Sequence, residues 1–213
     1  SFSGGKINGD KQPVADATLA DFAIVAVTEE GVDGYSLAIA DLKTPEVSCS
    51  TTDSLDPSRP LGKLDFTDAS AERLGGAGQG KMLVDRLQDG AAVLVAFEQV
   101  GGCQAALDMA MEYTRGRYAF GRPVASFQAI KHKLADIFVA TELARANAYY
   151  GAWALSTGAP ELPLAAATAR VSATEAYWLA SKENVQSHGG MGFTWEFDCH
   201  LYYRRAQHLA LLL

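Results

Sequence analysis

The sequence predicts an α+β fold in which a small antiparallel β domain is followed by a four-helix up-down bundle. Strand-like apolar runs separated by turn residues fill residues 1–76. From about Gly80 onward the sequence is rich in alanine and its apolar residues recur at helical spacing. The change follows Gly75-Gly76, so we expect a β domain at 1–76 and a helical domain at 77–213. Because the chain begins within strand-like residues, we expect the β domain to be partial.

The expected strands of the first domain share short apolar runs between clusters of Gly, Pro, Asp and Ser. They are FAIVAV at 22–27, YSLAIADL at 35–42 and KLDFT at 63–67.

The expected helices of the second domain are long and joined by short connections, which favours antiparallel neighbours. Gly101-Gly102 lies inside the first helix, where small side chains allow another helix to approach closely. Ser126 is the expected N-cap of the second helix, and Phe127, Ile130, Leu134, Ile137, Phe138 and Thr141 form its core-facing stripe. The helices are expected at about 80–115, from 126, from Pro163 to Ser187, and at about 197–213.

Charge and composition exclude several classes of function. The formal charge is −7 and the isoelectric point is near 5.1, so no general nucleic-acid or anionic-membrane surface is expected. No uninterrupted apolar run of about twenty residues is present to span a bilayer. The three cysteines have no zinc-ligand spacing, which predicts reduced thiols, no metal site and a cytoplasmic location.

Residues 113–136, YTRGRYAFGRPVASFQAIKHKLAD, combine a basic helix end with a glycine-containing turn. Arginine side chains at such a place can donate charge-assisted hydrogen bonds to a pyrophosphate, while a phenylalanine packs against a ring system. Residues 185–197, VQSHGGMGFTWEF, place several glycines after a helix end, where free backbone N–H groups can bind an anion. Taken alone, the first segment is also typical of a solvated basic turn, and the second is also typical of a helix C-cap.

Together, these two segments resemble the acyl-CoA dehydrogenase family, in which they read Y-x-x-x-R-x-x-F-G-x-P-I-x-x-F-Q and Q-x-x-G-G-x-G-[FY]. The resemblance implies FAD as cofactor, bound across a subunit boundary. It assigns cofactor contacts to Arg117, Phe120, Gln128, Gln186, Gly189 and Gly190. It also implies an acyl-CoA substrate, an electron-transferring flavoprotein as acceptor, and a homo- or hetero-oligomer. His188 is expected to cap or pack rather than to act as a base.

The family pattern fails where the reacting groups are expected. The family removes the substrate α-proton with a glutamate, but Leu213 and Ala91 stand at its two usual positions. Ala15 likewise replaces the threonine that meets the flavin edge in the family. Glu98 lies in the apolar run VLVAFEQVGG and is the candidate catalytic base; the alternative is a carboxylate paired inside the bundle.

Two functional hypotheses are favoured over a third, a helical-bundle protein that has lost flavin binding. The first is an FAD-dependent acyl-CoA dehydrogenase of lipid or steroid side-chain catabolism with its base at an unusual position. The second is a catalytically incomplete subunit that supplies FAD contacts and scaffold to an active homologous partner. The FTWEFDCHLYYRRA ending resembles bacterial members of the family, some of which form such heteromers. The family's N-terminal helical domain and first β strands would precede Ser1.

Overall fold

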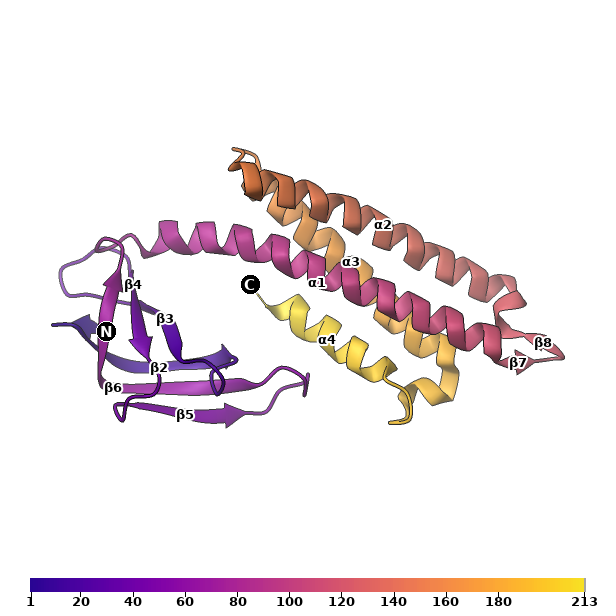
Figure 1. The fold of residues 1–213 in the computed structure, drawn as a ribbon, viewed down its shortest axis with the longest axis horizontal. Coiled ribbons are helices and arrows are strands. Elements are labelled where there is room, and N and C mark those ends of the chain that lie inside the picture. The colour runs from indigo at the N-terminus through magenta and orange to yellow at the C-terminus, as the bar shows by residue number, and fades with distance from the viewer. Residues whose placement is uncertain (213) are drawn as a thin grey trace. The chain divides into compact units, whose positions relative to one another are not determined.

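The computed structural model describes residues 1–212, and Leu213 lies outside the described residues. The chain divides into two compact units, Ser1–Leu87 and a second unit that begins at Gln88. An antiparallel sheet comes first and four long helices follow, so the predicted α+β class is confirmed (Figure 1).

The first unit is built on one antiparallel sheet with the strand order β1-β2-β6-β4-β3, in which β5 also pairs with β6. Ile7, Leu64 and Phe66 lie in its core, with Val25 and Val27 from β3. The expected strands at 22–27 and 35–42 are β3 and β4, and the one at 63–67 is part of the longer β6. The strands are β1 (Phe2–Ser3), β2 (Lys6–Ala15), β3 (Phe22–Val27), β4 (Ser36–Asp41), β5 (Val47–Thr52) and β6 (Leu61–Leu74).

The second unit is an up-down bundle in which α1 and α3 run one way and α2 and α4 run the other way (Figure 1). Pro163 stands in the first turn of α3, as expected for a residue that needs no N–H partner there. The helices are α1 (Gly80–Gly116), α2 (Gln128–Thr157), α3 (Leu162–His188) and α4 (Cys199–Leu211).

Small residues bring the helices of the bundle close together. A Cβ atom added to Gly102 of α1 would lie 2.4 Å from Cζ of Tyr177 on α3, so the glycine admits the tyrosine ring. Ala144 and Ala148 of α2 are fully buried in the same core as Tyr177. The close approach that Gly101-Gly102 predicts therefore occurs, and Gly102 is the residue that permits it.

Two expectations for the second helix are wrong. Phe138 is 53% exposed, because the buried face of α2 runs through Ile137, Thr141, Ala144 and Ala148 and Phe138 lies beside that face. Ser126 is not the N-cap: it lies in the 3₁₀ turn η1 (Val124–Ser126) and its hydroxyl donates to the Pro123 carbonyl at 2.7 Å. The helix begins two residues later, at Gln128.

By length and composition alone, α1 is apolar enough to cross a membrane, a test that core helices of globular proteins also pass. Ala96, Val100 and Leu107 of this helix lie in the core of the bundle, and Val93 is buried as well. Burial within the bundle therefore accounts for much of the apolar character of α1.

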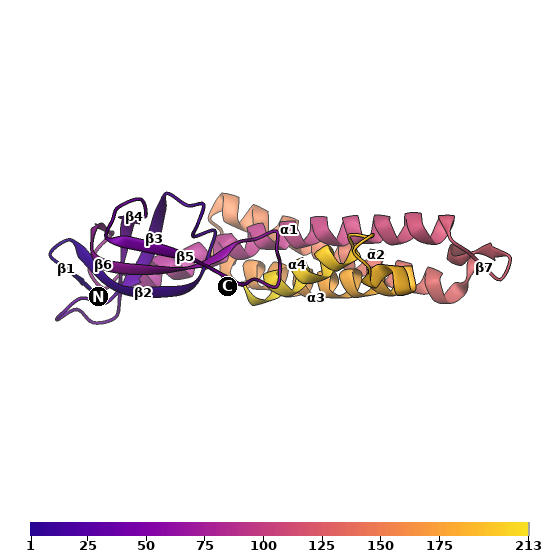
Figure 2. The same cartoon turned by 90° about the horizontal axis from the view of Figure 1, so that it is seen from below.

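One end of the bundle carries short irregular elements. The hairpin of β7 (Tyr118–Ala119) and β8 (Arg122–Pro123) connects α1 to α2, and the 3₁₀ helix η2 (Gly189–Phe193) follows α3. Figures 1 and 2 both show the hairpin at the end of the bundle where α1 ends and α2 begins. Because α1 and α3 run in the same direction, η2 lies at this end too.

Candidate functional site

The up-down order of the helices brings the predicted cofactor residues to one end of the bundle. Arg117 and Phe120 follow α1, and Gln128 is the first residue of α2. Gln186 lies in the last turn of α3, and Gly189 opens η2 together with Gly190. Segments about fifty residues apart in the sequence are thereby joined in one region, as a shared ligand requires.

Arg117 extends from a backbone that is fixed on both sides. Its N–H donates to the Tyr113 carbonyl at 2.9 Å, which continues the last turn of α1, and its carbonyl accepts from the Val124 N–H at 2.8 Å. The side chain is exposed, and within residues 1–212 it forms no ion pair. A fixed backbone below an uncompensated guanidinium is suited to binding a phosphate.

Phe120 occupies an unfavourable position for a phenylalanine. It stands in the hairpin turn at φ +53°, next to Gly121 at φ +77°. This is the left-handed region, which glycine and asparagine adopt more readily than aromatic residues. The ring is also 96% exposed, so it contributes little to the core. Strain and exposure together point to a binding role for this side chain.

The glycine turn presents bare backbone at the end of α3. Gly189 has φ +58°, and its N–H contacts the Gln186 carbonyl as the C-cap of the helix. A Cβ atom added to Gly190 would meet nothing within 4 Å, so a ligand can approach there. At Gly192 a Cβ atom would lie 2.5 Å from the Val185 carbonyl oxygen, because the turn folds back on the helix. Gly192 is therefore needed for the shape of the turn, whereas the backbone at Gly190 stays accessible to a ligand.

A groove of about 340 Å³ lies between the arginine segment and the glycine turn. Arg117 and Gly116 line it from the end of α1, and Met191 lines it from η2. Glu112, Tyr113 and Phe197 complete its wall. The two segments that the sequence singles out thus meet in one concave surface.

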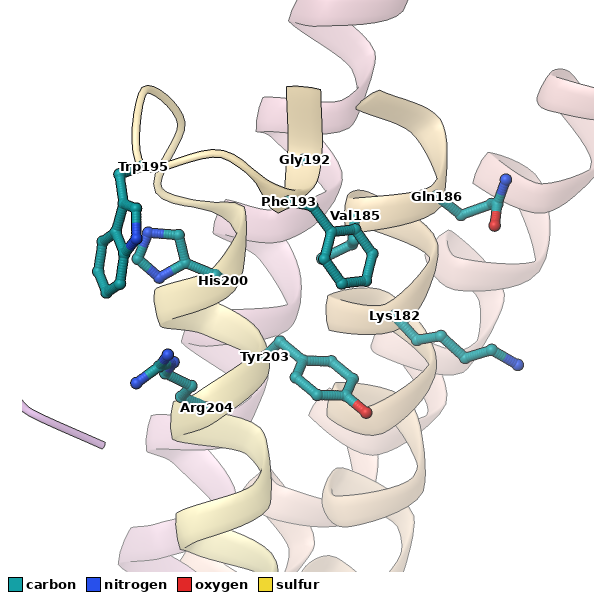
Figure 3. Close-up of a pocket in the computed structure, with 9 residues that line it drawn as sticks. All are labelled: Lys182, Val185, Gln186, Gly192, Phe193, Trp195, His200, Tyr203 and Arg204. Carbon is teal, nitrogen blue, oxygen red and sulfur yellow. The ribbon is translucent and has the colours of Figure 1, made fainter. Parts of the chain in front are cut away.

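A second groove of about 490 Å³ lies between the end of α3 and α4. Figure 3 shows Phe193 between the two helices, with Lys182 and Gln186 pointing to one side and Trp195 and Arg204 to the other. The guanidinium of Arg204 lies 5.5 Å from the centre of the Trp195 ring. Gln186 is therefore at the edge of this groove rather than in the Arg117 groove.

Three aromatic rings under the Arg117 groove are functional candidates that the motifs alone did not show. Tyr113 stacks on His188 with ring centroids 4.1 Å apart, and Phe197 packs against both rings at 5.5 and 5.3 Å. Tyr113 opens the Y-x-x-x-R motif and His188 and Phe197 lie in the second segment, but the sequence does not show that the three rings meet. His188 caps and packs, as its position predicts: its Nδ1 contacts the Asn184 carbonyl at 2.9 Å.

The predicted catalytic base lies far from this end of the bundle. Glu98 is nineteen residues before Arg117 on α1, or about 28 Å along the helix. Its Oε1 accepts from Nη1 of Arg205 on α4 at 2.6 Å, with the glutamate side chain 33% exposed. This pairing is the alternative that the sequence left open for Glu98. Ala91 is half-buried on α1, and the family's other base position, Leu213, lies outside the described residues.

Comparisons with known proteins identify the helical unit. Residues 78–212 match the family model described as acyl-CoA dehydrogenase, C-terminal domain. The chain is 46% identical over 127 residues to the acyl-CoA dehydrogenase IpdE2 of Mycobacterium tuberculosis, a match that covers 60% of this chain and 38% of that relative. The chain thus corresponds to only part of this relative.

Solved structures agree over nearly the whole chain. Butyryl-CoA dehydrogenase from Megasphaera elsdenii superposes with a TM-score of 0.91 at 29% identity, covering 97% of this chain and 56% of that chain. The Tcur3481-Tcur3483 steroid ACAD superposes with a TM-score of 0.85 at 27% identity, covering 98% and 56%. The family match spans more than half of the chain and includes the arginine segment and the glycine turn. The chain belongs to the acyl-CoA dehydrogenase family.

Proposed function

We propose that the full-length protein is an FAD-dependent acyl-CoA dehydrogenase in which this chain binds the adenosine-pyrophosphate half of FAD. The groove shared by Arg117 and Met191 is the observation that supports it most directly. A guanidinium without an ion-pair partner in residues 1–212 lines this groove opposite Met191, and the neighbouring Gly190 leaves the backbone of the turn accessible.

The residues of this region fit that half of FAD. The pyrophosphate would accept hydrogen bonds from Arg117 and from the open backbone near Gly190. Phe120 offers an exposed ring for the adenine, and Gln128 offers an amide for the ribose or the base. Gln186 offers a second amide from the edge of the neighbouring groove between α3 and α4. None of the six cofactor candidates carries a carboxylate, although Glu112 also lines the groove, and we assign the region to FAD binding.

The proposed reaction is the α,β-dehydrogenation of an acyl-CoA thioester, in which a carboxylate takes the α-proton. FAD, when bound, accepts the β-hydrogen as hydride. Glu98 is the carboxylate that the sequence offers for this role, and its Oε1 is bonded to Nη1 of Arg205 on α4. This pairing makes Glu98 less suited to the role, because the carboxylate oxygen that accepts from Arg205 is not available to the substrate.

A steroid-type acyl-CoA substrate and a heteromeric assembly extend this proposal. The likeness to a structure described as a steroid ACAD supports a bulky acyl group. An electron-transferring flavoprotein is the proposed acceptor, and a homo- or hetero-oligomer is the proposed assembly, because FAD contacts in the family cross subunits. Neither nucleic acid nor a membrane is part of the proposal.

The second candidate is a partner subunit without its own base, favoured by the Glu98–Arg205 pair and by alanine at position 91. The visible spectrum of the purified full-length protein separates the two. A yellow protein that bleaches when an acyl-CoA is added anaerobically contradicts the partner-only function. A colourless chain that becomes yellow and active only with a co-expressed homologue contradicts the self-sufficient enzyme.

Arg117→Ala tests the cofactor site itself. The flavin content per subunit is expected to fall and the Kd for FAD to rise by about tenfold or more, since charge-assisted bonds contribute about 1.5–3 kcal/mol. Arg115→Ala is the matched control, because Arg115 is an exposed arginine of the preceding turn that does not line the groove. Unchanged flavin binding in Arg117→Ala would remove the assignment.

A further inference from the structure

The ring of His188 lies between the two parts of the proposed FAD site, the Arg117 segment and the Gly189–Gly192 turn. It stacks on Tyr113 of α1 at 4.1 Å with an angle of 24° between the ring planes. Phe197, which precedes α4, packs against it at 5.3 Å. The side chain is only 3% exposed, so it acts through its neighbours rather than by touching a ligand.

The hydrogen bonds of His188 fix its tautomer. Nδ1 lies 2.9 Å from the Asn184 carbonyl, which can only accept, so Nδ1 carries the proton. Nε2 is buried and has no hydrogen-bond partner within residues 1–212. A neutral ring with one nitrogen bonded to the helix end serves here mainly as a flat packing surface.

The side chain of His188 contacts both parts of the site. On the α1 side, the carbonyl of Tyr113 accepts from the Arg117 N–H at 2.9 Å, so the residue that stacks on His188 also anchors Arg117. On the other side, a Cβ atom added to Gly192 would lie 3.1 Å from the Cβ of His188. The glycine turn therefore folds back against the base of the His188 side chain, directly after the residue that stacks on Tyr113.

We propose that His188 is a positioning residue that sets the separation between Arg117 and the Gly189–Gly192 turn. The inference rests on the proposed function, because the group that this separation matches is the FAD pyrophosphate. Tyr113 is the other member of the contact. Stacked rings contribute about 0.5–1.5 kcal/mol beyond the area that they bury, enough to hold one preferred spacing.

The test compares two substitutions of His188 in the full-length protein by titrating the apoprotein with FAD and following flavin fluorescence. His188→Ala removes the ring and is expected to raise the Kd for FAD by about fivefold to tenfold. His188→Phe keeps a flat ring without its nitrogens and is expected to restore the Kd to within about twofold of the wild type. Equal losses in both variants, or no loss in either, would overturn the proposal.

Ile137→Val controls for general destabilisation of the bundle. Ile137 is fully buried in the core and does not line the Arg117 groove, and this change costs about 0.5–1.5 kcal/mol. Its Kd for FAD is expected to match the wild type. A loss of FAD affinity as large as that of His188→Ala would show that the effect is only structural and would overturn the proposal.

A double-mutant cycle that combines Tyr113→Leu with His188→Ala measures whether loss of the Tyr113–His188 stack causes the loss of FAD affinity. The two losses of FAD affinity are expected to be less than additive, because each variant breaks the same contact. Fully additive losses would overturn the proposal. Arg117→Ala separates the hypotheses: if it loses FAD while the His188 variants do not, only the positioning role fails. If the wild type binds no FAD, the proposed function itself fails.

Discussion

Glu98 and Arg205 form an ion pair that connects α1 to α4, with 2.6 Å between Oε1 and Nη1. Both side chains are partly shielded from solvent, at 33% and 23% exposure. The only candidate base that the sequence offered within the apolar part of α1 is thus bonded to a cation on another helix. The pair gives the glutamate a structural reason to be there.

Glu98→Gln is expected to keep most of the catalytic activity and to lower stability by about 1 kcal/mol, because a partly exposed ion pair contributes little. Steady-state rates with an acyl-CoA, together with the melting temperature, check this. A base removed from a dehydrogenase costs about a hundredfold to ten-thousandfold in rate. A loss of that size in Glu98→Gln, without unfolding, would make Glu98 the catalytic base.

Phe120→Asn is expected to weaken FAD binding while leaving stability unchanged or raised. Asparagine tolerates the left-handed backbone at φ +53° better than phenylalanine, and the exposed ring supports no core. Loss of a ring stacked on a base costs about 1–3 kcal/mol, or about fivefold or more in the Kd for FAD. Tyr118→Ala, at a neighbouring exposed ring of the hairpin, is the control. A lower melting temperature with unchanged FAD affinity would assign Phe120 to folding.

Gly102→Ala and Gly101→Ala are a matched pair for the packing of the bundle. At Gly102 the added methyl group would lie 2.4 Å from the Tyr177 ring, and overpacking of this kind costs about 1–3 kcal/mol. At Gly101 nothing lies within 4 Å, and alanine in a helix is favoured over glycine by about 1 kcal/mol. Melting temperatures are expected to fall for Gly102→Ala and to rise slightly for Gly101→Ala. Similar shifts for both would contradict the close contact between α1 and α3.

His188 is expected to make stability depend on pH in the mildly acidic range. Burial lowers the pKa of His188 below its ordinary value of 6.5, although the bond to the Asn184 carbonyl opposes the shift. Below about pH 6.5 the unfolded chain binds a proton that the folded chain does not, so stability falls as the pH falls. Melting temperatures from pH 5 to 8 should show the wild type losing stability relative to His188→Phe below pH 6.5. Parallel curves would show that His188 titrates normally in the folded protein.

Much of the fold could be read from local patterns. Two of the three expected strands have nearly the expected bounds, and each helix bound that was predicted within residues 1–212 lies within about three residues of the observed one. Proline at the start of α3 and paired glycines at its end explain why these bounds were predictable. The pattern was less informative on α2, where Phe138 fits a helical stripe but points outward. The spacing of apolar residues predicts which face of a helix is buried. The neighbouring helices decide which large side chains at the edge of that face are buried.

The sequence by itself determined the fold class, the family motifs and the residue types of the proposed FAD site, because these depend on spacing along the chain. The tertiary structure decided what those residues face. Only the up-down packing of the helices brings Arg117 beside the glycine turn, places His188 between them and pairs Glu98 with Arg205. These are contacts between residues up to about a hundred positions apart, and they arise from helix packing rather than from any local pattern.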